Sequence, residues 1–502
     1  MAKFSRMVAL CLNCMNSELI LPSVLLALVI GACQAVSPAP IVRPTSVVSS
    51  ARLVSPDPAN ILVDANQVVR QKPLGIGGVD INSHSPDFAK NANGIDFQDD
   101  LKEARVQLVR SLTYPDNRNP NNQLAYFDRN VKAIIGAGAT PLLIQYINPK
   151  LPFLKVNGTV GGTVETNLVF LVKHYMAAPY NLKLQYWEIS NEPDLGIDYK
   201  VSSPQEYSEL FNRCHDALVK AGLRDQVILA GPAVANAYRW PIPDGYNTQI
   251  LDYFLEHSNY SVDVVTFHNY AGSKTPDGLL NTPHKLDNMA DSAREITDKT
   301  NYGMAALLAK MKQIKFARPH VGVGITEHNT TYFQHTIANG LWNLALTHYY
   351  LYNPFGEITT AYLFDAYGSQ QGGLGHYDDN KQKDYSYWAL WINGNLRGSK
   401  VLSQKTTGNL DHNGKANLLV TATKDSANVY VEVINRSLAE IRDHVFLKGA
   451  GVGGKPKLFT MADGVLPQNG KPTMLGTSFD YVFPPMSASI FKFPLSSSTS
   501  RR

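Results

Sequence analysis

Cysteine is scarce in this sequence. Four cysteines occur among 502 residues, and three of them, Cys11, Cys14 and Cys33, lie within the first 33 residues. Cys214 is the only cysteine in the rest of the chain, so a disulfide within that part is excluded. The fold must therefore rely on a hydrophobic core, and the 44% of hydrophobic residues is enough for a large one.

An excess of one charge and several functional motifs are also lacking. The 46 Lys and Arg residues nearly balance the 42 Asp and Glu residues, and no basic run is present, which argues against nucleic acid as a partner. A Gly-x-Ser-x-Gly motif is absent, so a serine hydrolase has no support. The glycines at 75–78 lack the spacing of a dinucleotide-binding loop, and no His, Cys and Asp cluster has metal-ligand spacing. The sequence predicts no metal and no other cofactor.

The N-terminus has the pattern of an export signal. Lys3 and Arg6 precede an apolar stretch at 19–30, which is short of the roughly 20 residues that a permanent membrane span needs. Small residues directly before Cys33 resemble a bacterial lipobox. We expect residues 1–33 to be either a lipoprotein signal, with Cys33 lipidated and anchoring the chain to a membrane, or a plain signal peptide of a secreted or periplasmic protein. Met15 is an alternative start.

Residues 34–58 are rich in Ser, Pro, Val and Ala without helical periodicity, and they predict a tether. Beyond them, eight short β-prone runs alternate with longer segments of helical spacing. This pattern is typical of parallel strands joined by crossover helices, and eight such units over roughly 300 residues predict a (β/α)8 TIM barrel at 73–392. The runs are residues 74–81, 106–113, 141–147, 184–190, 227–231, 262–268, 321–326 and 360–364.

The pattern changes after the barrel. Short alternating strands at 418–423, 429–433 and 487–493, separated by Gly, Asn and Pro turns, predict an antiparallel β-sandwich over residues 393–495. Residues 59–72 also alternate and are expected to add a strand to that sandwich. The polar residues 496–502 predict a disordered tail.

Two glutamates follow strands that are far apart in the sequence. Glu192 is the second residue after the fourth run, and Glu327 comes directly after the seventh. Reactive side chains of TIM barrels lie at the C-terminal ends of the strands, so we expect both carboxylates at one mouth. Two converging carboxylates are what the cleavage of a glycosidic bond requires.

The residues around both glutamates resemble clan A of the glycoside hydrolases. The triplet Asn191-Glu192-Pro193, combined with a glutamate at the end of the seventh strand, is similar to the acid/base and nucleophile motifs of that clan. Within the clan the chain is most similar to family 39, which includes β-xylosidases and α-L-iduronidases. The stretches that carry this similarity are 187–195, 207–211, 230–232, 267–270 and 326–332.

The resemblance implies a role for each carboxylate. Glu192 would be the general acid that protonates the leaving oxygen and then the base that activates water. Glu327 would be the nucleophile that forms a covalent glycosyl-enzyme. Glu188 is expected to pair with a cation deeper in the barrel.

Further residues are expected to line the substrate site. Asn191 would hydrogen-bond the sugar 2-hydroxyl, and Arg110 would keep the nucleophile ionised. His268 and Tyr270 would contact the sugar and Glu327, respectively. Polar and aromatic walls are expected from His84, Trp240 and Tyr332.

Taken together, these motifs imply an exported retaining glycoside hydrolase that acts on an oligo- or polysaccharide by double displacement. Exo action of the β-xylosidase type is favoured. The alternatives within the clan are an α-L-arabinofuranosidase, a β-glucuronidase and an endo-acting polysaccharide hydrolase. A surface protein that binds a glycan without cutting it is a further alternative, against which the presence of both glutamates argues.

Overall fold

The structure is a computed structural model of the chain. The predicted signal and tether, including Cys33, lie outside the described residues. Among the residues that the structure describes, no helix is both long and apolar enough to cross a bilayer. The structure describes residues 60–73, 75–81, 97–111, 123–145, 163–194, 201, 203–235, 250–258, 261–271, 304–330, 336–352, 356–362, 382–410, 416–452, 456–462, 465–468 and 477–496.

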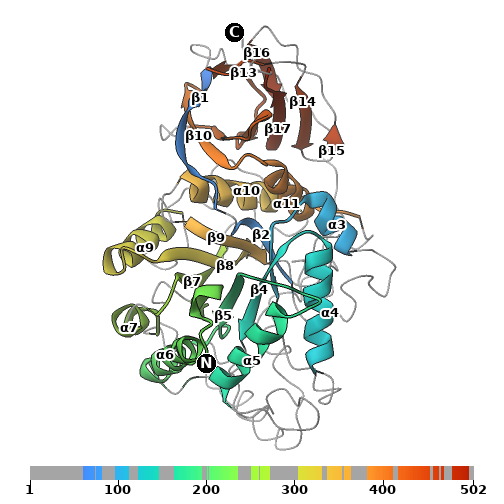
Figure 1. Cartoon of the computed structure of the whole chain (residues 1–502). Coiled ribbons are helices and arrows are strands. Elements are labelled where there is room, and N and C mark those ends of the chain that lie inside the picture. Colours follow the sequence, from blue (N-terminus) through green and yellow to red (C-terminus); the bar gives the residue numbers. More distant parts are fainter. Residues whose placement is uncertain are drawn as a thin grey trace, which may run out of the picture. The chain divides into compact units, whose positions relative to one another are not determined.

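Eight parallel strands form a closed barrel in the order of the chain (Figure 1). Each strand overlaps one of the eight predicted runs, and the pairing of the first strand with the last closes the ring. This confirms the predicted TIM barrel. The strands are β2 (Gly75–Ile81), β3 (Leu108–Ser111), β4 (Thr140–Gln145), β5 (Gln185–Ile189), β6 (Val227–Val234), β7 (Val264–Ala271), β8 (Gly322–Thr330) and β9 (Gly356–Tyr362).

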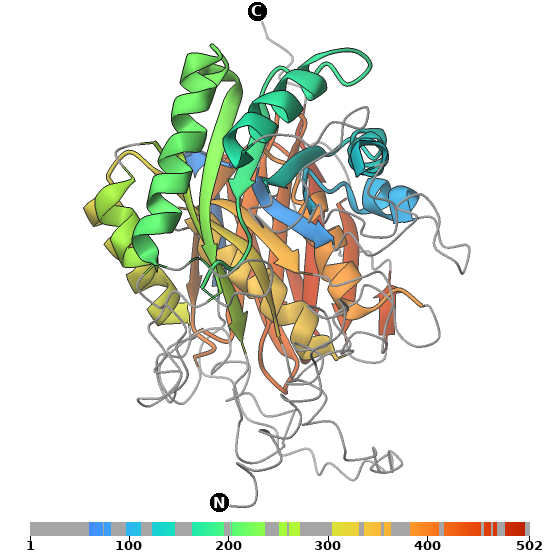
Figure 2. The same cartoon turned by 90° about the horizontal axis from the view of Figure 1, so that it is seen from below.

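Helices lie outside these strands. Figure 2, a view from below, shows two of them side by side, at 164–176 and 204–220. The second begins where the side chain of Ser203 accepts a hydrogen bond from the backbone N–H of Glu206 at 3.0 Å, with Pro204 at its first position. The helices are α3 (Phe97–Ala104), α4 (Gln123–Gly136), α5 (Val164–Met176), α6 (Pro204–Lys220), η1 (Arg224–Gln226), α7 (Ile250–His257), α9 (Met304–Ala317), α10 (Ile337–Tyr352) and α11 (Tyr385–Asn395).

Among the described residues, a second sheet of nine strands contains the strand that precedes the barrel and the strands that follow it. Its neighbouring strands pair antiparallel except for the first strand, which pairs in parallel with the strand at 441–448. The strands are β1 (Asn60–Gln71), β10 (Lys400–Thr407), β11 (Leu418–Lys424), β12 (Asn428–Asn435), β13 (Ile441–Lys448), β14 (Lys457–Ala462), β15 (Val465–Gln468), β16 (Ser478–Phe483) and β17 (Ser487–Pro494).

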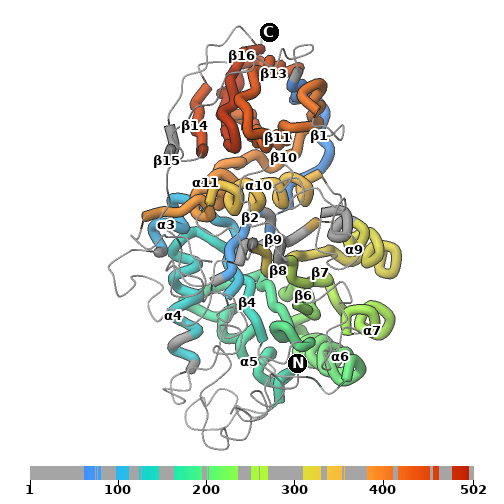
Figure 3. Tube along the Cα trace, turned by 180° about the vertical axis from the view of Figure 1, so that it is seen from behind, coloured from blue at the N-terminus to red at the C-terminus, as the bar shows by residue number. Residues whose placement is uncertain are grey.

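Burial along the strands follows from what covers them. β13 alternates buried and less buried residues, as expected of a strand with one face on a core. β11 and β12 are buried almost continuously because their second face contacts α10. The contact includes a 3.1 Å interaction between His348 Nδ1 on α10 and Thr421 Oγ1 on β11. Figure 3 shows α10 beside these strands from the opposite side.

Candidate active site

Glu192 lies in the segment that follows β5. That strand ends at Ile189, whose carbonyl accepts a 2.7 Å hydrogen bond from the hydroxyl of Tyr207 on α6. Glu192 itself has a φ of 45°, in the left-handed region that side chains other than glycine seldom adopt. Its backbone N–H donates to the carbonyl of Ala233 on β6 at 3.0 Å. These two bonds fix the segment to its neighbours, and they hold Glu192 in a strained conformation of the kind found at functional sites.

Glu327 lies within β8, because this strand continues to Thr330 instead of ending before the glutamate as predicted. The pairing of β8 with β7 shifts register just before His268 and Glu327, which are then directly paired. A register shift of this kind redirects side chains. Glu327 is 4% exposed, and Glu192 is 9% exposed.

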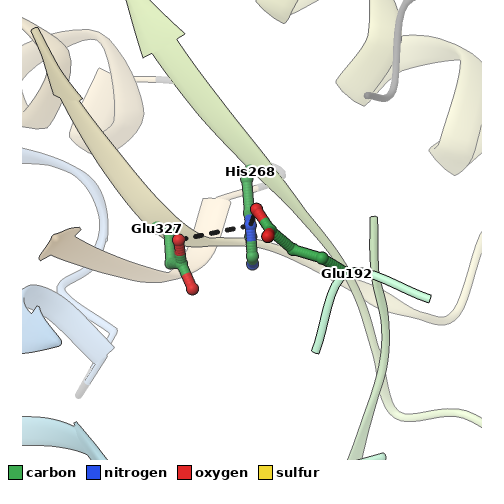
Figure 4. A group of neighbouring side chains, drawn as sticks. All are labelled: Glu192, His268 and Glu327. Carbon is green, nitrogen blue, oxygen red and sulfur yellow. Dashed lines mark hydrogen bonds and ion pairs between the residues drawn. The ribbon is translucent and has the colours of Figure 1, made fainter. Parts of the chain in front are cut away.

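His268 lies between the two glutamates (Figure 4). Its Nδ1 is 3.0 Å from Oε1 of Glu192 and 3.4 Å from Oε2 of Glu327. Burial lowers the pKa of His268, while the nearby charge of Glu327 opposes that shift. The net effect favours a neutral ring with a single proton, and when Nδ1 carries that proton it donates toward the carboxylates.

Arg110 on β3 is completely buried beside this group and contacts four side chains. Its guanidinium donates to Asn191 Oδ1 at 2.9 Å. The three remaining partners are carboxylates, namely Glu188 at 2.7 Å, Glu327 at 2.7 Å and Asp80. The contact with Glu188 fits the predicted pairing of this residue with a cation.

Asp80 on β2 was not identified from the sequence as part of this group. It is completely buried, and its Oδ1 has no hydrogen-bond partner among the described residues. Burial raises the pKa of Asp80 well above its usual value against the opposing charge of Arg110, and Glu327 and Glu188 raise it further. Burial thus favours the neutral form of Asp80. The sequence signal was an aspartate inside an otherwise apolar strand run.

The remaining predicted site residues are placed only in part. Tyr270 belongs to β7, two residues beyond His268, but its side chain lies outside the described residues. The predicted contacts of His268 and Asn191 with a sugar, and of Tyr270 with Glu327, stay predictions. Three predicted wall residues lie outside the described ranges, namely His84, Trp240 and Tyr332.

One group among the described residues could also hold a metal ion. Glu192, His268 and Glu327 each offer one ligand atom, and these atoms all lie within 4.8 Å of one another. Sequence spacing did not reveal this group because its members come from distant parts of the chain, 76 and 59 positions apart (268 − 192 and 327 − 268). The same three side chains could thus exchange protons in general acid–base chemistry or supply the ligand atoms for a cation.

No family model matches the sequence, and no curated protein matches it significantly. Solved structures do match the fold. A family 44 xyloglucanase from Paenibacillus polymyxa is 14% identical with a TM-score of 0.63, over 87% of this chain and 99% of that one. A family 51 α-L-arabinofuranosidase, AbfB from Bifidobacterium longum, is 16% identical with a TM-score of 0.62, over 87% of this chain and 100% of that one.

A bifunctional glucanase-xylanase from a metagenome library is 13% identical with a TM-score of 0.61, over 88% of this chain and 99% of that one. The chain has the fold of glycoside hydrolases. At these identities the likeness concerns the fold alone, so the similarity to family 39 stays a prediction.

Proposed function

We propose that this protein is a retaining glycoside hydrolase in which Glu192 is the acid/base and Glu327 the nucleophile. The observation that carries the proposal is the separation of the two carboxylates. One carboxylate oxygen of Glu192 and one of Glu327 lie within 4.8 Å of each other. Retaining pairs are about 5–5.5 Å apart, whereas inverting pairs leave about 6.5–9.5 Å for a water molecule.

In the first step, Glu327 attacks the anomeric carbon while Glu192 donates its proton to the leaving oxygen. Arg110 favours this division of roles because its permanent charge lies 2.7 Å from Oε1 of Glu327 and stabilises the ionised nucleophile. Two carboxylates this close repel each other when both are ionised, so one proton is retained between them. Glu192, next to the neutral His268, is the side chain that keeps it.

In the second step, water releases the sugar from the enzyme. The glycosyl bond to Glu327 has by then removed its negative charge, and the repulsion that kept Glu192 protonated has fallen. Glu192 is ionised after the first transfer and accepts a proton from the attacking water. The glycosyl–enzyme bond breaks, Glu327 regains its charge, and the anomeric configuration of the substrate is kept in the product.

The substrate class is proposed from the resemblance and from the proteins of the same fold. Those proteins are named as a xyloglucanase, an α-L-arabinofuranosidase and a glucanase-xylanase. We therefore expect a plant-type oligo- or polysaccharide substrate and favour exo action on β-xylosides. Chromogenic β-xylosides, α-L-arabinofuranosides and β-glucuronides are the first small substrates to test, and xyloglucan and xylan are the first polymers.

The test combines a substrate screen with proton NMR of the first product anomer. Retention of configuration on the best substrate is expected, and inversion would overturn the mechanism. Glu192→Gln should lower turnover by at least about 100-fold on substrates with poor leaving groups. Glu327→Gly should be inactive and regain turnover when azide is added, with a glycosyl azide as the product.

Glu440→Gln is the matched control because Glu440 is an exposed glutamate that precedes β13. Its activity should equal that of the parent protein. Full activity of either catalytic variant would exclude the assigned roles. A polysaccharide that binds but survives prolonged incubation with the parent protein would instead identify a glycan-binding protein.

We further propose that the chain is exported and that Cys33 carries the lipid. The support is the lipobox-like sequence that precedes Cys33. In a bacterial host, labelling with a radioactive fatty acid should mark the parent protein and not Cys33→Ser. Equal labelling of both would overturn the proposal, and recovery of an unlabelled parent protein from the culture medium would favour a plain signal peptide.

A further inference from the structure

In Figure 4 the side chain of His268 lies between those of Glu192 and Glu327. His268 Nδ1 lies 3.0 Å from a Glu192 oxygen and 3.4 Å from a Glu327 oxygen. Ligand atoms on a tetrahedral zinc ion, at bond lengths of about 2.0–2.2 Å, lie about 3.4 Å from one another. Two of the three spacings are thus close to those of a zinc site, and the third pair, which lies within 4.8 Å, would have to approach by at most about 1.4 Å.

The chemistry of these donors selects the kind of ion. One imidazole nitrogen and two carboxylate oxygens suit first-row transition metals such as zinc. Calcium and magnesium prefer sites built from oxygen alone. All three residues are at most 9% exposed, so a bound ion would exchange bulk water for protein ligands.

The charge around the group also favours a cation. The positive charge of Arg110 is shared among Asp80, Glu188 and Glu327. Glu192 adds a fourth carboxylate beside His268. A divalent cation at this position would add positive charge among these carboxylates, as the positive charge on the sugar does in part during glycosidic cleavage.

We propose that Glu192, His268 and Glu327 form a binding site for a divalent transition-metal ion, represented by Zn²⁺, and that the ion and the sugar substrate exclude each other. On binding, Glu192 releases its proton to solvent. The single proton of the neutral His268 ring resides on Nε2, so that Nδ1 presents its lone pair to the ion. The ion then occupies the position between the acid/base and the nucleophile. The second part rests on the proposed function, whereas the binding itself does not.

Binding is measured by isothermal titration of the full chain with ZnCl₂ after removal of metals with EDTA and desalting. Every protein in the comparison carries Cys11→Ser, Cys14→Ser and Cys33→Ser, because free thiols bind zinc strongly. One ion per chain is expected. No binding to this parent protein would overturn the proposal.

Two substitutions test the ligands without relying on activity. Glu192→Gln and His268→Asn each replace a ligand by a side chain of similar shape, and each should weaken Zn²⁺ binding by at least about tenfold. Circular dichroism and thermal unfolding establish that both variants are folded. Co²⁺ gives a second readout. Its visible absorption in the parent protein should report a nitrogen and oxygen ligand set, and this absorption should be lost in each variant that is folded.

The matched control is His444→Ala. His444 and Asp480 form an exposed pair at 2.8 Å on the second sheet, which is the type of surface site that binds zinc adventitiously. Zn²⁺ affinity should not change in this variant. A loss of binding in His444→Ala, or unchanged binding in both ligand variants, would overturn the proposal.

Competition is measured on the best small substrate of the screen. Zn²⁺ should raise KM without changing kcat, and EDTA should restore the original KM. Inhibition that lowers kcat alone would overturn mutual exclusion. If no substrate is found, the proposed function fails but the titrations still decide whether the metal site exists.

Discussion

Nη1 of Arg110 lies 2.7 Å from Oε1 of Glu327. This contact joins β3 to β8 across the barrel, between strands that are not neighbours in the sheet. Because the same guanidinium also contacts Glu188 on β5 and Asp80 on β2, one buried cation on β3 contacts carboxylates from three other strands. Glu327 is thus held by a network that extends below the mouth of the barrel.

Arg110→Lys should lower both activity and stability. Lysine keeps the charge but has a single ammonium group, which cannot reach four partners with the geometry of a planar guanidinium. We expect kcat/KM to fall about 100-fold and the free energy of unfolding to fall by about 3 kcal/mol. Steady-state kinetics and urea denaturation measure the two effects. Arg213→Lys, at a half-exposed ion pair with Glu165, should change neither.

Asp80→Asn should stabilise the protein above acidic pH. The raised pKa of Asp80 means that the folded state binds its proton more tightly than the unfolded state does. The resulting stability is complete below the unfolded pKa of about 3.9 and is lost as the pH rises toward the folded pKa. Asparagine has the shape of the neutral acid and no proton to lose. The stability gain of the variant should therefore grow with pH above about 4.

The activity and the stability of Asp80→Asn together test whether Asp80 is neutral in the folded protein. The asparagine oxygen still accepts a hydrogen bond from Arg110, so the variant should keep at least about half of the parent kcat. Urea denaturation from pH 4 to pH 8 and a pH profile of kcat are the measurements. A variant that is less stable than the parent at pH 7 would show that Asp80 is ionised in the folded protein.

The sequence was sufficient to predict the barrel because each strand is a short β-prone run between helical segments. Parallel barrel strands are covered on both sides, which makes these runs apolar and easy to recognise. It was also sufficient to place Glu192 and Glu327 near each other, since residues at the C-terminal ends of barrel strands converge. The extension of β8 past Glu327 was missed because a register shift depends on the partner strand, in this case β7.

Only part of the network below the glutamates was predicted from the sequence, namely a cation beside Glu188 and Arg110 near Glu327. Whether Asp80 contacts Arg110 depends on which neighbouring strand pairs with which, and in the structure these two residues are directly paired. The metal-ligand geometry of His268 depends likewise on contacts across separate strands. Only the presence of charged residues inside apolar runs pointed to these contacts, and a buried ion pair without function leaves the same signal.

Glu432→Gln should stabilise the protein near pH 8. Glu432 is completely buried on β12, and burial raises its pKa to about 8, although the charge of Lys72 opposes the shift. A raised pKa gives stability that is complete below about pH 4.3 and is lost as the pH rises to about 8. The neutral amide avoids this loss. We expect a gain on the order of 2 kcal/mol at pH 8 and almost none at pH 4.5.

Urea denaturation at both pH values measures the difference, and Glu440→Gln provides an exposed glutamate for comparison. The activity of Glu432→Gln should equal that of the parent, because Glu432 belongs to the second sheet and not to the group around Glu192. Equal stability changes at pH 4.5 and pH 8 would contradict the prediction.

Gly231→Ala should disturb the active site through α6. A Cβ at this position would lie 2.6 Å from the hydroxyl oxygen of Tyr207 and 2.8 Å from a ring carbon of Phe211. The Tyr207 hydroxyl donates to Ile189, the last residue of β5, so displacing α6 moves the segment that carries Glu192. We expect a loss of about 1–3 kcal/mol in unfolding free energy and about a tenfold loss in kcat.

The control for this substitution is Gly136→Ala, where the nearest atom is the end of the flexible Gln98 side chain and little change is expected. Adding Tyr207→Phe to Gly231→Ala removes the closest contact and should recover part of the lost stability. It should not recover kcat, because it also removes the hydrogen bond to Ile189. Recovery of both quantities would show that this bond does not position Glu192, and recovery of neither would assign the clash to Phe211.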